Sequence, residues 1–147
     1  MSDSDLISLY SGKILELAAS LRPPDRLDSP DASVRRRSPL CGSTVTVDLK
    51  LRDGHIAAYG QDVKACALGQ AAASVVQDVV IGCSRDDVVR ARDQLLAMLK
   101  SGGPAPDAPF DGLQVLMPAR DFKNRHASIM LALEATVEAF DKAQAAA

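Results

Sequence analysis

Residues 43–74 read STVTVDLKLRDGHIAAYGQDVKACALGQAAAS, and the spacing of their apolar residues changes near Lys64. Apolar and polar residues alternate over 44–52, which predicts a β-strand with one buried face. Asp53-Gly54 then supplies a tight turn, and the alternation resumes from Ile56. The stretch therefore predicts an antiparallel hairpin.

After Lys64 the small and apolar residues recur at helical spacing, so a helix is expected to begin at or next to Cys66. Alanine and serine side chains in this helix permit close packing on the sheet. A short strand around Val34–Arg37 is expected to add a third strand to the hairpin.

Three further helices are expected. The first covers residues 4–20 and ends at the proline-containing extended link 21–31. The second follows the Ser84/Asp87 capping pattern and stops at Gly102-Gly103. After a proline-rich loop, 104–113, the third runs from about Phe122 to Phe140, with an alanine-rich end that is expected to fray. Its inward-facing residues are expected to be Ile129, Leu133, Val137 and Phe140.

The fold class expected from this order is α+β, with a small antiparallel three-stranded sheet covered on one face by helices. With 147 residues, the chain has the size of one domain, and we expect residues 1–147 to form a single domain with its own core. No disulfide or metal is needed to hold a core of that size together.

The composition excludes several functional classes. Lys and Arg total 17 against 19 acidic residues, and aromatic residues make up 3% of the chain with no Trp, which argues against nucleic-acid binding. The basic run Arg35–Arg37 is read as a solvated or partner-facing strand end. Neither a signal peptide nor a membrane span is indicated, so no membrane partner is expected and the expected localisation is cytoplasmic.

Three cysteines, Cys41, Cys66 and Cys83, are an odd number and do not indicate a disulfide framework in a reducing compartment. They are buried apolar residues, metal ligands or reactive thiols. Cys41 precedes the first long strand and Cys66 follows the second, so both are expected at the same end of the sheet. The N-terminal end of a helix stabilises a thiolate, the form that binds metal or attacks sulfur.

Three segments together resemble the IscU/NifU-type family of iron-sulfur cluster assembly scaffolds. They are PLCGS (39–43), DGHIAAYGQDVKACALGQAAAS (53–74) and NRHAS (124–128), and the N-terminal segment is also similar to that of the family. The resemblance covers nearly the whole chain. It implies that Cys41 and Cys66 match the first two cysteine ligands of the family and that His126 matches the histidine beside the third.

The resemblance also shows two departures. Ser43 stands where the family has an aspartate, and Ala127 stands where it has the third cysteine. The implied metal-ligating set is thus Cys41, Cys66 and His126, with Ser43 as a weak oxygen donor. Histidine can replace cysteine at an iron-sulfur cluster, and three ligands with an open position also describe a zinc site. Cys83 matches no ligand of the family and is read as an incidental loop thiol.

The function that the resemblance implies is a non-enzymatic scaffold or carrier. It would take sulfur from a cysteine desulfurase, bind iron or a [2Fe-2S] cluster, with zinc as the alternative occupant, and pass the cluster to apo iron-sulfur acceptor proteins. A persulfide on Cys41 or Cys66 belongs to the same hypothesis. The alternative is a degenerate homologue that acts as a regulatory or interaction module without assembling clusters. A third hypothesis, enzymatic activity at a zinc-bound water, lacks an evident general base.

Overall fold

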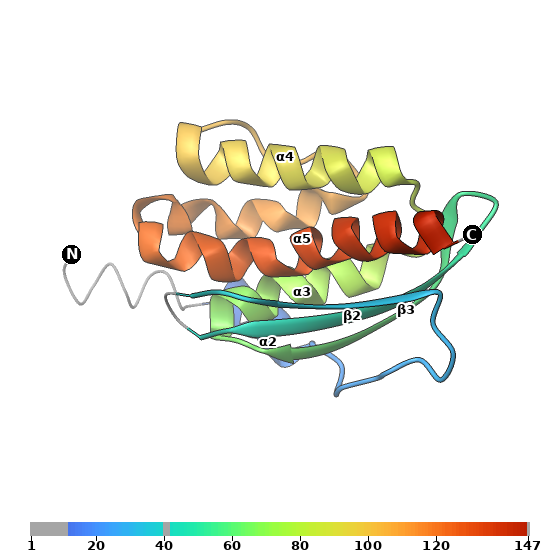
Figure 1. The fold of residues 1–147 in the computed structure, drawn as a ribbon. Coiled ribbons are helices and arrows are strands. Elements are labelled where there is room, and N and C mark those ends of the chain that lie inside the picture. The colour runs from blue at the N-terminus through green and yellow to red at the C-terminus, as the bar shows by residue number, and fades with distance from the viewer. Residues whose placement is uncertain (1–11, 40–41, 147) are drawn as a thin grey trace.

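The computed structural model describes residues 12–39 and 42–146. The sheet has the order β1-β2-β3, with antiparallel pairing throughout. The predicted α+β class and the predicted hairpin are confirmed, and so is the short lead-in strand (Figure 1). The strands are β1 (Ala32–Arg37), β2 (Thr44–Arg52) and β3 (His55–Lys64).

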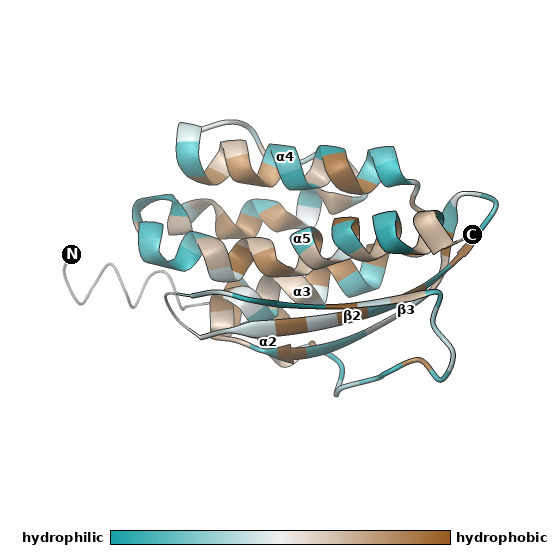
Figure 2. Ribbon diagram, in the orientation of Figure 1, coloured by the Kyte–Doolittle hydropathy of each residue, from teal (hydrophilic) through white to brown (hydrophobic). Residues whose placement is uncertain are grey.

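Helices cover one face of this sheet, as predicted. Helices α3 (Ala67–Val79) and α5 (Lys123–Ala146) lie against the strands, and α4 (Arg85–Ser101) packs on the far side of α5 (Figure 1). Apolar residues of β2 alternate toward this helix layer, and Val47 and Leu49 are fully buried there. Figure 2 shows the hydrophobic residues of the helices concentrated between the layers.

The predicted cap of α4 is confirmed. The Ser84 side chain accepts a hydrogen bond from the Asp87 backbone N–H, and the Asp87 carboxylate accepts one from the Ser84 N–H. Helix α3 begins directly after Cys66, which occupies its N-cap position as expected. None of the helices in the described part of the chain is long and apolar enough to cross a membrane.

Two predicted boundaries were wrong. The loop assigned to 104–113 ends at Pro109, because a 3-10 helix, η1 (Phe110–Asp121), follows it. Helix α5 continues past Phe140 to Ala146, since alanine favours helix and Ala143 is buried against the core. The inward-facing residues assigned to this helix, Ile129, Leu133, Val137 and Phe140, are all buried.

The N-terminal helix is described only in part, as α2 (Lys13–Ala19), which packs against α3. The remainder of that prediction, residues 4–11, lies outside the described residues. The extended link that follows crosses the face of the sheet opposite the helices (Figure 1). It approaches so closely that a Cβ atom on Gly60 would lie 2.1 Å from the carbonyl oxygen of Asp25.

A buried carboxylate fastens this link to the sheet. Asp48, on β2, is fully buried and accepts hydrogen bonds from the Arg26 guanidinium, at 2.6 and 3.1 Å, and from the Leu27 N–H, at 3.1 Å. Ser33 donates a further hydrogen bond to it. Burial opposes ionisation of Asp48, but these donors prevail and hold its pKa below the ordinary value.

Candidate functional site

Cys66 lies where β3 ends and α3 begins, with its side chain partly buried. Its backbone is extended, and its carbonyl oxygen accepts the first hydrogen bond of the helix, from Gln70 at 2.9 Å. The N–H groups of the first turn have no intrahelical acceptors, which gives this end of α3 a positive potential. The thiol therefore stands beside a group of backbone donors.

Two buried hydroxyl groups connect Cys66 to the rest of the site. The Sγ atom of Cys66 lies 3.6 Å from Oγ of Ser128 on α5, and Ser128 Oγ donates a hydrogen bond of 3.1 Å to Oγ of Ser43. Ser43 immediately precedes β2, so three segments far apart in sequence meet at this point. Ser43 is 4% exposed and Ser128 is 1% exposed, which makes Cys66 the most accessible member of the three.

The contact between Ser128 and Cys66 depends on a glycine in α3. A Cβ atom on Gly69 of α3 would lie 2.6 Å from Oγ of Ser128 and 2.8 Å from Cβ of Ala65. Only glycine lets α5 approach α3 closely enough for Ser128 to reach the thiol of Cys66. The small residues after Cys66 thus place Ser128 as well as pack on the sheet.

The side chain of His126 is bonded to η1 and not to the Cys66, Ser128 and Ser43 cluster. It is buried, and its Nε2 atom lies 3.0 Å from the carbonyl oxygen of Ala119 and 3.1 Å from that of Arg120, both at the end of η1. Because carbonyl oxygens only accept hydrogen bonds, Nε2 carries the proton in this arrangement. In the neutral imidazole, the lone pair is then on Nδ1.

Of the two other positions that the resemblance singled out, the structure describes Ala127 but not Cys41. Cys41 lies outside the described residues, and it precedes Ser43 by two positions. Ala127 lines a groove of about 730 Å³ between α4 and α5, together with His126 and Met130. Within residues 12–39 and 42–146, no three or more His, Cys, Asp or Glu side chains form a group that could hold a metal ion. A complete ligand set would thus need Cys41.

Cys83 is far from this site in the fold. Its carbonyl oxygen accepts a hydrogen bond from Ile56, and the neighbouring Ser84 pairs with His55, so Cys83 lies by the hairpin turn at the opposite end of β3. The thiol is buried and contacts the carbonyl oxygen of Val79 at 3.5 Å. Burial, and to a lesser degree the Asp87 charge, raise its pKa.

Ser128 is the residue of this cluster that the sequence analysis missed. A serine on a helix ordinarily faces solvent, but the residues that follow Ser128, over 129–133, are all buried. An apolar surround of this kind indicates a buried hydroxyl that needs a partner. The identity of that partner depends on the tertiary contact at Gly69.

Comparisons with solved structures found clear similarity. The N-terminal part of a nitrogen-fixing NifU-like protein from Brucella abortus is 42% identical, with a TM-score of 0.93 over 97% of this chain and 99% of that one. A protein assigned as an iron-sulfur cluster assembly scaffold for the SUF system of Fervidobacterium islandicum AW-1 is 16% identical, with a TM-score of 0.80 over 91% and 98%. The latter shows the fold alone. No protein-family model and no curated protein matches the chain.

Proposed function

The chain belongs to the IscU/NifU-type family of iron-sulfur scaffold proteins, and from this premise we propose that it is a scaffold or carrier for iron and sulfur. Its cargo is iron or a [2Fe-2S] cluster, and zinc is the alternative occupant. The proposed ligands are Cys41, Cys66 and His126, with Ser43 as a weak neutral donor. Residues 1–147 are proposed to act as one scaffold domain.

The observation that carries this proposal is the placement of Cys66. Its thiol is partly exposed, stands beside the backbone donors of α3 and lies one hydroxyl group away from Ser43 at the start of β2. Cys41 precedes Ser43 by two residues, and a two-residue segment spans at most about 7 Å. Thiolates are ligands that suit soft metal ions and clusters.

The hydrogen bonds of His126 indicate which of its ring nitrogens would be the ligand. A histidine that binds a metal ordinarily donates its other ring N–H to a backbone carbonyl or a carboxylate. Nε2 of His126 already meets two carbonyl oxygens, at 3.0 and 3.1 Å. We therefore propose Nδ1 as the nitrogen that would contact the cargo.

The proposed role is non-catalytic. Sulfur comes from a cysteine desulfurase, and the cluster passes to apo iron-sulfur acceptor proteins. We place this exchange in the cytoplasm, where reducing conditions keep the thiols free. Two thiolates and one imidazole leave a fourth position open, and an open position favours release over permanent storage.

A second candidate function is favoured by one observation. Ala127 has no donor atom and lines the groove between α4 and α5. A member of the family without that thiol would keep the surface that meets a desulfurase and lose the capacity to build clusters. This interaction module is the alternative to the scaffold.

Anaerobic reconstitution with ferrous iron and sulfide, followed by iron and sulfide analysis and a visible spectrum, separates the two functions. The scaffold predicts bound iron and sulfide with charge-transfer absorption that Cys66→Ala abolishes. Cys83→Ala is the matched control, and it should bind as much iron as the wild type, because Cys83 lies at the other end of β3. Equal loading of the Cys66→Ala variant would contradict the site, and zinc alone or no metal in the wild type would favour the interaction module.

A further inference from the structure

Three basic side chains gather on the outer face of the sheet, opposite the helices. The strand register places Arg37, Thr44 and Lys64 in one cross-strand row and Arg35, Thr46 and Asp62 in the next. Because side chains alternate between faces, both rows point away from the buried Val45 and Val47. We call Arg35, Arg37 and Lys64 the basic sheet end.

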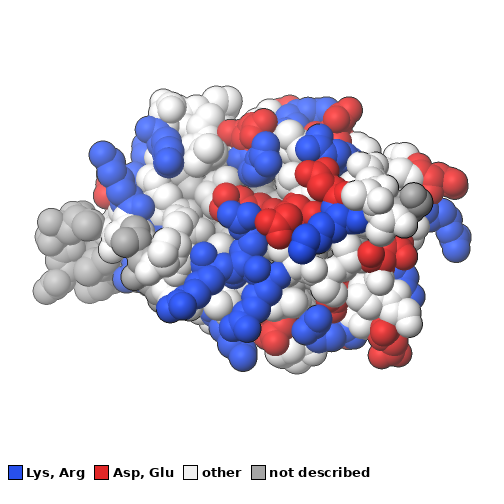
Figure 3. Space-filling view, in the orientation of Figure 1, with Lys and Arg blue, Asp and Glu red and all other residues white. Residues whose placement is uncertain are grey.

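These three cations differ from their neighbours in having no acidic partner. All three are exposed, and none forms an ion pair or side-chain hydrogen bond with any residue that the structure describes. By contrast, Arg36 contacts Glu134 at 3.8 Å and Glu138 at 3.0 Å, and Arg26 is bound to Asp48. Basic side chains cover the sheet in the lower left of the space-filling view (Figure 3).

The surface between the two rows is hollow. A cavity of about 390 Å³ is lined by Arg26, Arg35 and Lys64 together with the hydroxyls of Thr44 and Thr46. Asp62 is the one acidic residue among its lining residues, against the two unpaired cations Arg35 and Lys64, because the third lining cation, Arg26, is bound to Asp48. Hydroxyl donors beside unpaired cations suit a carboxylate that enters from outside.

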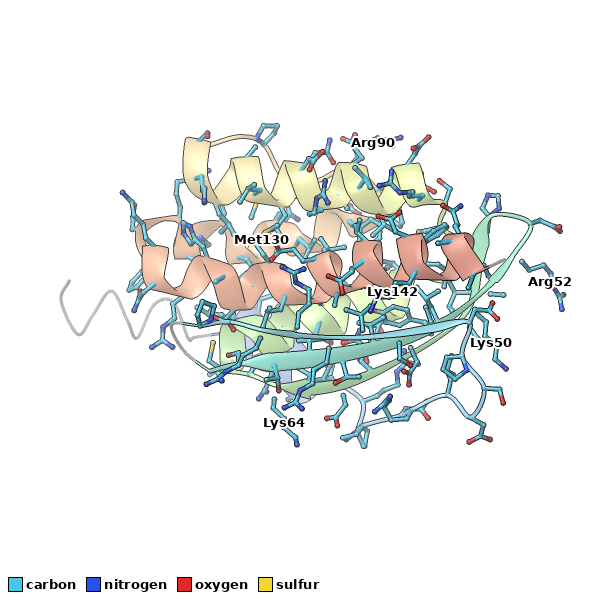
Figure 4. All side chains as sticks on the ribbon, in the orientation of Figure 1. Lys50, Arg52, Lys64, Arg90, Met130 and Lys142 are labelled. Carbon is cyan, nitrogen blue, oxygen red and sulfur yellow. The ribbon has the colours of Figure 1, made fainter. Side chains whose placement is uncertain are left out.

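The basic sheet end borders the proposed cargo site. Lys64 precedes Cys66 by two residues. On β1, Arg37 is followed by Ser38, whose N–H donates a hydrogen bond of 2.8 Å to the carbonyl oxygen of Ser43. A segment bound across these strands would therefore end beside Cys66. Lys50 and Arg52 lie at the other end of the hairpin, as Figure 4 shows.

We propose that the basic sheet end is a docking surface for an acidic segment of the protein that donates sulfur to Cys66; this partner assignment rests on the proposed scaffold function. Carboxylates of the donor contact Arg35, Arg37 and Lys64, and this contact brings its cysteine persulfide to Cys66. The Cys66 thiolate attacks the outer sulfur of that persulfide, so that a persulfide forms on Cys66 and the donor cysteine leaves as a thiolate. Nucleic acid is disfavoured, because the lining residues of the cavity include no aromatic side chain for base stacking and the chain has a net charge of -2.

The surface is tested first without any cluster. A ¹⁵N-labelled sample is titrated with a synthetic octaglutamate peptide at low salt, and amide shifts are followed by NMR. Shifts are expected around Arg35, Arg37 and Lys64, and the double charge reversal R37E/K64E should weaken binding by about five-fold or more. K50E/R52E is the matched control with the same change in net charge, and it should bind the peptide nearly as well as the wild type.

The partner is tested by comparing two sulfur sources in reconstitution. With a purified cysteine desulfurase and cysteine, R37E/K64E should assemble clusters several-fold more slowly than the wild type. With free sulfide it should assemble them at the wild-type rate. Equal rates with the desulfurase, or an equal slowing with free sulfide, would overturn the proposal.

If the wild type assembles no cluster at all, the scaffold function is contradicted but the docking surface is not. The peptide titration still tests the docking surface in that case. Peptide shifts spread over both ends of the hairpin, or unaffected by R37E/K64E, would overturn the docking surface. Tighter binding of a 12-nucleotide single-stranded DNA than of the peptide would overturn it as well.

Discussion

The Ser128 hydroxyl on α5 stands between the Cys66 thiol and the Ser43 hydroxyl, 3.6 Å from the first and 3.1 Å from the second. This hydroxyl bridges the N-terminal end of α3 and the start of β2. Because Ser128 donates its proton to Ser43, its remaining lone pairs face Cys66 as acceptors.

Ser128→Ala removes the bridging hydroxyl and leaves the buried Ser43 without one of its hydrogen-bond partners. We expect a loss of about 1 kcal/mol in the free energy of unfolding, the usual contribution of a buried neutral hydrogen bond. Denaturation in urea gives the value. Ser101→Ala is the control, because Ser101 is exposed at the end of α4 and should change stability little. Equal effects of the two substitutions would contradict the role assigned to Ser128.

Gly69→Ala tests the close approach of α3 and α5. Alanine favours helix, but its Cβ atom would lie 2.6 Å from Oγ of Ser128, so we expect a net destabilisation of about 1–3 kcal/mol from overpacking. Gly112→Ala is the matched control, because its nearest neighbour would be Cγ1 of Val75 at 3.4 Å, an ordinary contact. A Gly69→Ala protein as stable as Gly112→Ala would show that the helices can separate without cost.

Asp48 makes the fold sensitive to acid. Its folded pKa lies below its unfolded value of about 4, so its charge stabilises the fold above that pH. This contribution is lost as the pH falls through the folded pKa. The free energy of unfolding should therefore decrease as the pH is lowered from about 5 toward 2, and it should decrease less in Asp48→Asn.

The control for this prediction is Asp28→Asn, since Asp28 is exposed on the link. It should keep the wild-type dependence on pH. The carboxyls of Asp87 and Asp141 also have lowered pKa values, but they are present in all three proteins and so contribute equally. Identical pH profiles for the wild type and Asp48→Asn would contradict the prediction.

The thiols should differ in their reactivity toward iodoacetamide. Cys83 is 5% exposed and its pKa is raised, so its alkylation in the native protein should be slower than that of Cys66 by about ten-fold or more. Peptide mass spectrometry after timed quenching measures each rate separately. Comparable rates at the two positions would show that the turn holding Cys83 opens readily, and urea should abolish the difference.

The strands and most helix ends could be predicted from the sequence because local rules set them. The alternation of apolar and polar residues predicted β2 and β3, and the Ser84 capping pattern predicted the start of α4. The 3-10 helix η1 was not predicted because its buried residues do not recur with the 3.6-residue period of an α-helix. Its buried residues recur at every third position, which is the period of a 3-10 helix. They are Phe110, Leu113, Leu116 and Ala119.

The candidate site could be predicted only in part. The place of Cys66 at the start of α3 follows from local signals, whereas its contact with Ser128 depends on how closely two helices pack. The orientation of His126 depends on carbonyl groups of η1, an element that the sequence analysis did not include. Whether His126 shares a metal site with Cys66 stays a prediction.

The link over residues 21–31, which crosses the outer face of the sheet, forms few hydrogen bonds to the strands. Within the described residues, its hydrogen bonds to β2 and β3 come from Asp25, Arg26, Leu27 and Asp31. A local opening event would have to break these bonds and the one from Arg22 to the carbonyl oxygen of Gln77 on α3, while the helix layer on the other face stayed packed. Amide protons of the link should therefore exchange through a separate, low-energy unfolding unit, and we expect the link to detach while the sheet and the helix layer stay intact.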